Sequence, residues 1–561
     1  MMSTHNLADY ERERESFSWG DIYAEADWDA PGRMNIAHEV CDRHAEATPE
    51  RTALRYAGTN GEREDVTFAD LAERSNRFAN LLEGEGIERG DRVFTFMPRV
   101  PAHFVSLIGT LKRGATFGGV NERFGPDGIS YRLADCDAKA ILTTTGNRDV
   151  VERALADVPS VETVIVVDHG NGDDGTGGRR DGDVAYDEAM AAAGAEYETA
   201  ETSGEDDALL YYTSGTTGLA KGVLHKHRWV AGVAATQRFA VDLRPGEDLY
   251  WSSGDLGWLV GPINTLGAWF WGTSQFTYEG EFEPEAWADL LDEFPVTVLF
   301  SVPTAYRMLR EHESVLEGVD SDLRHALSIG EPLSAGVVEW GEEALGVTIL
   351  DTYGQTETGN MIISNYPTME VRPGSMGKPL PGIEATVVDP ETGEPLEPGE
   401  TGEIAQRGDY PCFFAGYWDQ PEQTADCFVN DWYLSGDLGH LDADGYFWFE
   451  GRADDVILSA GYRIGPFEVE SSLGEHPAVA EGAVVPKPDD QRGNIVKAYV
   501  VLSEGAEATE ETTEDIKRHV REELAAHEYP REIEFVSELP KTITGKIRRT
   551  ELRDRTESAA D

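Results

Sequence analysis

The stretch Thr213–Lys221, which reads TSGTTGLAK, carries residue types that bind anions. Glycines and small hydroxyl residues let backbone N–H groups approach an anion closely, and a lysine adds a point charge. The Walker A loop, G-x-x-x-x-G-K-[ST], is the best-known phosphate cradle. Its spacing is absent here, because Lys221 follows Gly218 by three residues and is followed by Gly222. On its own, the stretch is either a phosphate loop of another kind or a flexible turn.

A second candidate for charge chemistry lies near the C-terminus, in PKTITGKIRR at 540–549. This basic cluster stands out in an acidic chain, and its simplest interpretation is a solvated tail. However, Gly545 precedes Lys546 in a threonine-rich turn. That arrangement favours a lysine that is directed toward a site.

The segments around these residues predict an α/β fold. ALLYY directly before the glycine-rich stretch reads as a buried strand, as do TVIVV (163–167), TVLFS (297–301) and VTIL (347–350). Helical patterns at 68–86 and 102–114 lie between such runs. Alternation of this kind predicts parallel sheets covered by helices. The Gly/Asp-rich segment 169–183 is expected to be an exposed loop before Tyr186.

The chain is too long for one ordinary core, and its character changes at GRADD (451–455). After this point come two candidate strands (481–486 and 496–502), a helix (514–527) and the basic end. We therefore predict an N-terminal domain at 1–452, a hinge at 453–455 and a small α+β C-terminal domain at 456–561.

The charge balance excludes some partners. The chain has 561 residues, with 105 acidic against 47 basic side chains and a net charge of −58. Nucleic acids and anionic membranes need a cationic face, so neither is expected as a partner. The acidic residues are dispersed along the chain, which favours a salt-accumulating cytoplasm where repulsion is screened. An acidic protein of an ordinary cytoplasm is the alternative.

Targeting and redox signals are absent from the sequence. The four cysteines show no C-x-x-C spacing, so neither a zinc site nor a disulfide framework is expected. The N-terminus lacks the build of a signal peptide. The most apolar stretch, 256–272, is broken by glycines, Pro262 and Asn264, which fits a buried pocket wall better than a membrane helix. A cytoplasmic protein without a membrane span is expected, and its oligomeric state stays open.

Seven ordered motifs together resemble the adenylate-forming superfamily, which includes AMP-forming acyl-CoA synthetases, luciferases and peptide-synthetase adenylation domains. The motifs are YYTSGTTGLAKG (211–222), GEP (330–332), DTYGQTETG (351–359), YLSGD (433–437), GRADD, SAGYRIGPFEVE (459–470) and PKTITGKIRR. The resemblance implies a large adenylate-forming domain of helix-covered sheets with a small mobile C-terminal domain. It also implies that TSGTTGLAK is a phosphate loop for the β- and γ-phosphates of ATP.

The resemblance further implies the reaction and its residues. A carboxylate attacks the α-phosphorus of ATP, and this step needs in-line geometry and charge neutralisation. Glu357 would hold Mg²⁺, Thr356 would contact the α-phosphate, and Asp437 would accept the ribose hydroxyls. Lys546 would bridge the substrate carboxylate and the α-phosphate. The whole set implied for ATP is Thr213, Ser214, Gly215, Thr216, Thr217, Gly218, Lys221, Gly330, Glu331, Pro332, Asp351, Thr352, Tyr353, Gly354, Gln355, Thr356, Asp437, Arg452 and Lys546.

In this superfamily the C-terminal domain changes pose between adenylation and thioester formation. Asp454 stands at the hinge position, and Gly461 is where a side chain would block the pantetheine tunnel. The residues implied for CoA are Ser459, Ala460, Gly461, Arg463, Arg492, Arg521, Tyr529 and Arg531.

The motifs are most similar to the acetyl- and medium-chain acyl-CoA synthetase branch. Acetate-specific members carry a tryptophan before the QTET glutamine, where this chain has Gly354. We therefore expect room for a medium-chain, branched or aromatic acid, with Gly354, Trp258 and Tyr306 in the acyl pocket. Trp258 and Tyr306 are alternatively ordinary core residues.

Other functions stay open at this stage. The alternatives are an acetyl- or propionyl-CoA synthetase, a ligase that loads a carrier protein, and a nucleotide-binding paralogue without turnover. No carrier-domain serine motif follows the tail, and no damage is visible at Lys546, Glu357 or the loop.

Overall fold

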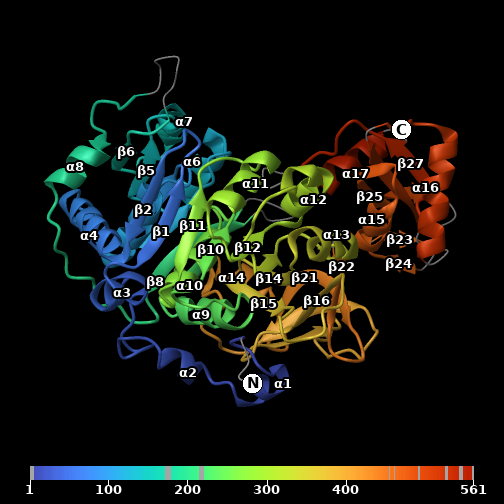
Figure 1. Ribbon diagram of the computed structural model, residues 1–561, viewed down its shortest axis with the longest axis horizontal. Coiled ribbons are helices and arrows are strands. Elements are labelled where there is room, and N and C mark those ends of the chain that lie inside the picture. Colours follow the sequence, from blue (N-terminus) through green and yellow to red (C-terminus); the bar gives the residue numbers. More distant parts are fainter. Residues whose placement is uncertain are drawn as a thin grey trace.

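The computed structural model describes residues 5–170, 178–213, 220–453, 455, 457–459, 462–489, 493–503, 505–524, 529–541 and 547–558. The chain forms a large N-terminal body of helix-covered sheets and a small C-terminal lobe, which lies at the right of Figure 1. This arrangement confirms the predicted α/β class. The exact domain bounds stay a prediction, and the proposed hinge residue Asp454 lies outside the described residues.

One sheet of the body has its strands in the order β19-β9-β8-β4-β3-β5-β6-β7, and β5 and β6 of this sheet are labelled at the left of Figure 1. The strands from β8 to β7 are parallel, whereas β9 is antiparallel to both of its neighbours. The bounds are β3 Arg92–Phe96, β4 Thr116–Gly119, β5 Ala140–Thr144, β6 Thr163–Val167, β7 Val184–Ala185, β8 Asp207–Thr213, β9 Lys221–Lys226 and β19 Gly416–Tyr417. The predicted strands at 163–167 and before the glycine-rich stretch are thus confirmed.

A second sheet runs in the order β17-β18-β21-β22-β16-β15-β14-β13-β12-β10-β11-β1-β2, with β20 beside β21. It is parallel from β14 to β1 and antiparallel beyond these strands. The bounds are β1 Thr52–Ala57, β2 Arg63–Thr67, β10 Leu249–Ser252, β11 Ser274–Tyr278, β12 Val298–Ser301, β13 His325–Ser328, β14 Ile349–Gln355, β15 Asn360–Ser364, β16 Ser375–Pro379, β17 Glu384–Val388, β18 Gly402–Arg407, β20 Phe428–Val429, β21 Trp432–Leu441 and β22 Phe447–Arg452. The predicted strands near 300 and 350 are confirmed as β12 and β14.

Helices cover both sheets, and the two predicted helical patterns are confirmed as α4 and α5. Thr67 caps α4 through a capping box with Asp70, and Pro101 begins α5 at a position where no amide donor is needed. The helices of the body are α1 Tyr10–Ser16, α2 Trp19–Tyr23, α3 Arg43–Ala47, α4 Phe68–Gly84, α5 Pro101–Lys112, α6 Pro126–Asp135, α7 Arg148–Ala154, α8 Tyr186–Ala192, α9 Trp229–Phe239, α10 Val260–Phe270, α11 Pro284–Glu293, α12 Pro303–Glu311, α13 Ala335–Trp340 and α14 Pro421–Ala425. Short 3-10 or π-helical turns lie at His38–Asp42, Leu155–Asp157, Glu313–Leu316 and Gly341–Leu345.

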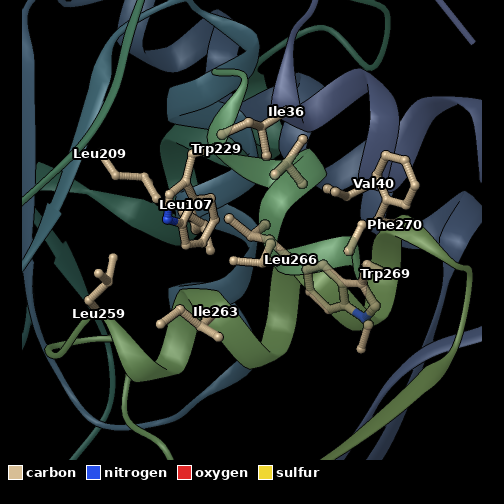
Figure 2. Close-up of a cluster of buried hydrophobic side chains, with 14 of the residues drawn as sticks. Ile36, Val40, Leu107, Leu209, Trp229, Leu259, Ile263, Leu266, Trp269 and Phe270 are labelled. Carbon is tan, nitrogen blue, oxygen red and sulfur yellow. The ribbon is translucent and has the colours of Figure 1, made fainter. Parts of the chain in front are cut away.

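The apolar stretch 256–272 forms the buried helix α10, which packs in the core that Figure 2 shows. Leu266 and Trp269 of α10 are fully buried in this core, which also contains Trp229 of α9. Asn264 is also buried, and it accepts a hydrogen bond from the Tyr250 hydroxyl at 2.8 Å and donates one to Ser252 at 2.9 Å. This helix is therefore core. Among the described helices, none is long and apolar enough to cross a membrane.

The two sheets of the body are tied together at one edge by His169 and Glu279. His169 follows β6, and its Nε2 lies 2.5 Å from Oε1 of Glu279, which follows β11. The Tyr56 hydroxyl on β1 donates to the other carboxylate oxygen at 2.8 Å. The hydrogen bond to Glu279 raises the pKa of His169, and the same bond lowers the pKa of Glu279. Both shifts favour the form in which His169 is protonated and Glu279 is ionised, so the link between the two sheets is an ion pair in that form.

The C-terminal lobe is a small sheet in the order β24-β23-β26-β25, with β27 beside β26 and helices packed against it. Its elements are β23 Ile457–Ser459, β24 Tyr462–Ile464, α15 Pro466–Glu475, β25 Val479–Asp489, β26 Gly493–Leu502, α16 Glu510–Glu523, β27 Glu532–Phe535 and α17 Arg549–Ser558. The predicted strands and helix of this region are confirmed as β25, β26 and α16. The lobe touches the body where the Phe467 ring meets the Phe449 ring, with centroids 6.0 Å apart.

Candidate active site

The candidate site lies where β14 ends and turns into β15. β14 carries Tyr353 and Gln355, and the turn that follows carries Thr356 and Glu357. β14 runs parallel to β13, so its C-terminal end lies at the sheet edge where α/β proteins bind ligands. β21 and β22 of the same sheet contribute Asp437 and Arg452, which face each other as paired residues.

Asp437 is the centre of a buried hydrogen-bond network. It is only 5% exposed, yet its Oδ2 accepts hydrogen bonds from the Tyr353 hydroxyl at 2.7 Å and from Nε2 of Gln355 at 2.6 Å. Nη1 of Arg452 donates to Oδ1 at 3.0 Å, and the Asp437 amide donates to Oγ of Ser435 at 3.1 Å. Burial, followed by the nearby carboxylate, raises the pKa of Tyr353, so this hydroxyl stays a donor. The network fixes the carboxylate, and carboxylate oxygens have further lone pairs for a ligand hydroxyl.

Glu357 and Lys221 both contact the Tyr417 side chain, Glu357 at its hydroxyl and Lys221 at its ring face. The Tyr417 hydroxyl donates to Oε1 of Glu357 at 2.9 Å, and Nζ of Lys221 lies 4.4 Å from the centre of the Tyr417 ring. Glu357 and Lys221 are both half-buried. One carboxylate, with ligand phosphates and water, is the kind of protein site that Mg²⁺ uses. Glu357 fits that role, because Oε2 accepts no hydrogen bond from any residue that the structure describes. Within the same part of the chain, no group of three or more metal-ligating side chains gathers.

The predicted adenine wall, Gly330 to Pro332, is fixed by a tight turn and by hydrogen bonds to the Glu331 side chain. Gly330 has a positive φ of 91°, which favours glycine at this turn. The Glu331 carboxylate accepts hydrogen bonds from the Thr304 hydroxyl at 2.7 Å and from Arg307 at 2.7 Å. On the neighbouring β14, the Thr352 hydroxyl donates to the Ser328 carbonyl at 2.8 Å. Pro332 follows Glu331 in the chain and is half-buried.

Asp351 lies inside the sheet edge rather than in an open site. It is 6% exposed, and its Oδ1 accepts a hydrogen bond from the Thr352 amide at 3.0 Å. Burial raises the pKa of this carboxyl well above its ordinary value. The carboxyl therefore serves the local backbone.

The backbone around Gly354 is closely packed, and its expected place in the acyl pocket stays a prediction. Gly354 lies where the pairing of β14 and β15 changes register. A Cβ on Gly354 would collide with the backbone carbonyl of Asn360 on β15. The missing side chain therefore allows a close approach of two strands.

The other two residues expected in the acyl pocket have different positions. Tyr306 is fully buried, and its hydroxyl donates to the Leu327 carbonyl at 2.9 Å, so the core alternative holds for this residue. Trp258 is half-buried just before α10, with its ring 5.5 Å from the Phe124 ring. Trp258 therefore keeps a position that fits a pocket wall.

The structure brings part of the predicted CoA set together in the C-terminal lobe. The guanidinium groups of Arg521 and Arg531 lie 5.5 and 4.9 Å from the centre of the Tyr529 ring. Nη1 of Arg531 also donates to the Tyr529 hydroxyl at 3.0 Å. Ser459 is buried at the end of β23, and Arg463 lies on the adjacent β24.

Several predicted residues lie outside the described part of the chain. Thr213 ends β8 and Lys221 begins β9, but residues 214–219 of the loop between them are among those not described. The predictions that fall outside the described residues are Ser214, Gly215, Thr216, Thr217, Gly218, Asp454, Ala460, Gly461, Arg492 and Lys546.

Sequence analysis missed Tyr417 and Tyr433 as parts of the site. The Tyr433 hydroxyl donates to Oε1 of Gln355 at 3.0 Å, which orients the amide that binds Asp437. Tyr433 stood within the YLSGD motif, so the motif itself was an available signal. Tyr417 stands in a GYW stretch, where nothing in the local sequence distinguishes it from a core aromatic residue.

We expect Gly354→Ala to destabilise the fold without changing acid preference. The added methyl group must displace the β15 backbone, and overpacking of this kind costs about 1–3 kcal/mol. Thermal melts and kcat/KM for acids of two to ten carbons measure both effects. Gly84→Ala is a matched control, because a Cβ at Gly84 meets no atom within 4 Å. A Gly354→Ala protein that melts like the parent and prefers shorter acids would favour the pocket interpretation.

Comparison with known proteins identifies the family of this chain. Residues 41–418 match the family described as AMP-binding enzyme, and residues 468–546 match the AMP-binding enzyme C-terminal domain. The chain is 40% identical over 555 residues to acetyl-coenzyme A synthetase of Bacillus subtilis, covering 98% of this chain and 95% of that protein. It is 38% identical over 538 residues to mitochondrial acyl-coenzyme A synthetase ACSM4 of Homo sapiens, covering 93% and 91%. The crystal structure of the anthranilate CoA ligase AuaEII in complex with anthranoyl-AMP superposes with a TM-score of 0.87 at 30% identity, covering 97% of this chain and 100% of that one. The chain therefore belongs to the AMP-binding enzyme family, in its acyl-CoA synthetase branch, as its motifs predict.

Proposed function

We propose that this protein is an AMP-forming acyl-CoA synthetase that joins a medium-chain, branched or aromatic carboxylic acid to CoA. ATP and the acid form an acyl-adenylate and pyrophosphate, and the CoA thiol then displaces AMP. The observation that carries this proposal is the Asp437 network beside Glu357, at the end of β14. Adenylate formation needs a fixed carboxylate for the ribose and, next to it, a carboxylate oxygen for a metal-bound phosphate; among the described residues, Oε2 of Glu357 has no hydrogen-bond partner.

In this proposal the residues of the body bind and orient ATP. Asp437 accepts the two ribose hydroxyls, and Arg452 keeps that carboxylate aligned from the opposite side. Lys221 supplies positive charge near the departing pyrophosphate, since it directly follows the phosphate loop on β9. Bound Mg²⁺, held by Glu357, would neutralise phosphate charge. Together these groups stabilise the charge that develops on pyrophosphate in the transition state.

The C-terminal lobe supplies the remaining groups in this proposal. Lys546 lies within the matched C-terminal family segment, and it would bind the acid carboxylate and the α-phosphate during adenylation. Arg521 and Arg531, which flank Tyr529, would bind CoA phosphates in the second half-reaction. Asp454 would serve as the hinge between the two poses.

The preference for an acid larger than acetate has less support than the reaction itself. Its support is the half-buried aromatic pair of Trp258 and Phe124, and the similarity to an anthranilate ligase. Acetate or propionate is the second candidate, because the Bacillus subtilis relative is an acetyl-coenzyme A synthetase.

A panel of acids distinguishes these two candidates. We expect CoA-dependent AMP release to increase in kcat/KM from acetate through hexanoate, or to be highest with benzoate. Each buried methylene contributes up to about 0.8 kcal/mol, which is roughly four-fold. A maximum at acetate or propionate would select the second candidate. Turnover of every acid without CoA, with transfer to a carrier protein, would contradict both.

We expect Lys546→Ala to slow adenylation about 100- to 1000-fold, because a preorganised cation at developing charge has an effect of this size. Thioester formation from presynthesised acyl-adenylate should be spared, since that step uses the other pose. Pyrophosphate release and acyl-CoA formation report the two half-reactions separately.

The control for this experiment is Lys541→Ala, which removes an exposed lysine of the same segment that pairs with Glu481 at 2.6 Å. It should leave both half-reactions near the parent's rates. Equal loss of both half-reactions in Lys546→Ala would contradict the two-pose model.

We also propose that the protein works in concentrated salt, and this proposal rests on the net charge of −58. The screening length grows from about 3 Å at 1 M salt to about 10 Å at 0.1 M, so acidic residues repel one another over longer distances. The melting temperature should therefore fall as KCl is lowered over this range. A melting temperature that is constant or higher in dilute salt would exclude the adaptation.

A further inference from the structure

Tyr417 occupies a junction between the two sheets of the body, beside the proposed site. It lies on β19, which pairs with β9, where Tyr417 stands opposite Val223. The segment before it is bound to the other side of the site, because the Phe414 amide donates to the Glu357 carbonyl at 3.1 Å. The Trp418 amide donates to the Gly222 carbonyl at 2.7 Å. The short segment 414–418 is thus attached both to the turn that carries Glu357 and to the strand that carries Lys221.

The Tyr417 side chain connects the same two places. Its hydroxyl donates to Oε1 of Glu357 at 2.9 Å, and its ring lies 4.4 Å from Nζ of Lys221. The Cys427 thiol donates weakly to the tyrosine oxygen at 3.8 Å, which leaves the hydroxyl proton for Glu357. Burial, and then the charge of Glu357, raises the pKa of Tyr417, so the hydroxyl keeps that proton.

Packing fixes the orientation of this ring. Tyr417 is only 8% exposed, and the Phe414 ring meets it edge-on with centroids 5.3 Å apart. Tyr433 lies 5.7 Å from Phe414 in the same cluster. A ring held by neighbours in this way presents its hydroxyl and its face in fixed directions, so it can orient two charged groups at once.

We propose that Tyr417 is a positioning residue that sets the separation between Glu357 and Lys221 and thereby couples Mg²⁺ binding to pyrophosphate binding. The inference rests on the proposed function, in which Glu357 is the metal ligand and Lys221 binds phosphate. The hydroxyl aligns the carboxylate through one oxygen. The ring holds the ammonium group by a cation–π contact, which does not neutralise its charge. Outer-sphere partners of this kind affect metal affinity by about 10- to 100-fold.

Two substitutions separate the two contacts. Tyr417→Phe keeps the ring under Lys221 and removes the hydrogen bond to Glu357, whereas Tyr417→Leu removes both. The matched control is Tyr446→Phe, which deletes another buried hydroxyl outside the site. The Tyr446 hydroxyl donates to the Glu370 carbonyl, with 2.7 Å between the two oxygens. Thermal melts establish that each variant is folded at the assay temperature.

Calorimetry with α,β-methylene-ATP, which cannot be cleaved at the reacting bond, measures the effect without turnover. We expect Tyr417→Phe to raise the Mg²⁺ concentration for half-maximal binding about ten-fold, while metal-free binding of pyrophosphate stays within two-fold of the parent. Tyr417→Leu should weaken pyrophosphate binding as well. Tyr446→Phe should match the parent in both measurements.

A double variant tests whether Tyr417 acts through Glu357. In a Glu357→Gln background, Tyr417→Phe should no longer change the Mg²⁺ dependence. Independent, multiplying effects would overturn the proposal, as would a Tyr417→Phe protein with the parent's Mg²⁺ dependence. If the parent itself binds no ATP analogue, the proposed function fails. If the parent binds the analogue and forms acyl-CoA, but Tyr417→Phe keeps the parent's Mg²⁺ dependence, only the positioning role is overturned.

Discussion

The buried carboxylate of Asp437 is the interaction on which the rest of the site depends. A carboxylate that is 5% exposed is unfavourable unless donors surround it. Here the donors come from Tyr353 and Gln355 on β14 and from Arg452 on β22, which are far apart in the sequence. Loss of one donor would leave a buried charge partly unpaired, which is far more costly than loss of a surface contact. The need to satisfy one charge therefore holds three strands in register at the place where ATP is proposed to bind.

Close approaches of the backbone impose a second constraint on the same motif. Gly354 lies against Asn360, and Gly359, with a φ of 68°, lies so close to the Cys412 carbonyl that any side chain would collide with it. The Cys412 region leads into the segment with Tyr417. The glycines of DTYGQTETG thus let the turn that carries Glu357 approach both β15 and the 412–418 segment. Part of a motif that resembles a ligand-binding signature is required for packing.

Features with a local cause could be predicted from the sequence. The helical periodicity at α4 and the apolar runs at β6 and β12 are local sequence patterns, and the structure has the expected helix and strands there. The ordered motifs indicated the family and placed Tyr353, Gln355 and Asp437 in one site. The close approach of β15 to Gly354 could not be predicted, because a glycine marks either free space or a close neighbour and the local sequence does not distinguish the two. Tyr417 was missed because its partners come from distant parts of the sequence. The pairing of β19 with β9 brings Lys221 to it, and the bond from the Phe414 amide to the Glu357 carbonyl brings Glu357, neither of which a local pattern encodes.

The cations of this acidic chain have two kinds of partner, carboxylates and aromatic rings, and the difference affects how anionic ligands would bind. Surface cations such as Arg55, which binds Asp65 through two hydrogen bonds of 2.7 Å, are neutralised by carboxylates. Lys221, Arg521 and Arg531 lie against tyrosine rings and form no ion pair with another residue that the structure describes. A ring face attracts a cation through its quadrupole and leaves its full positive charge for an incoming phosphate. Aromatic support therefore keeps selected cations available in a molecule whose net charge would otherwise repel ATP and CoA.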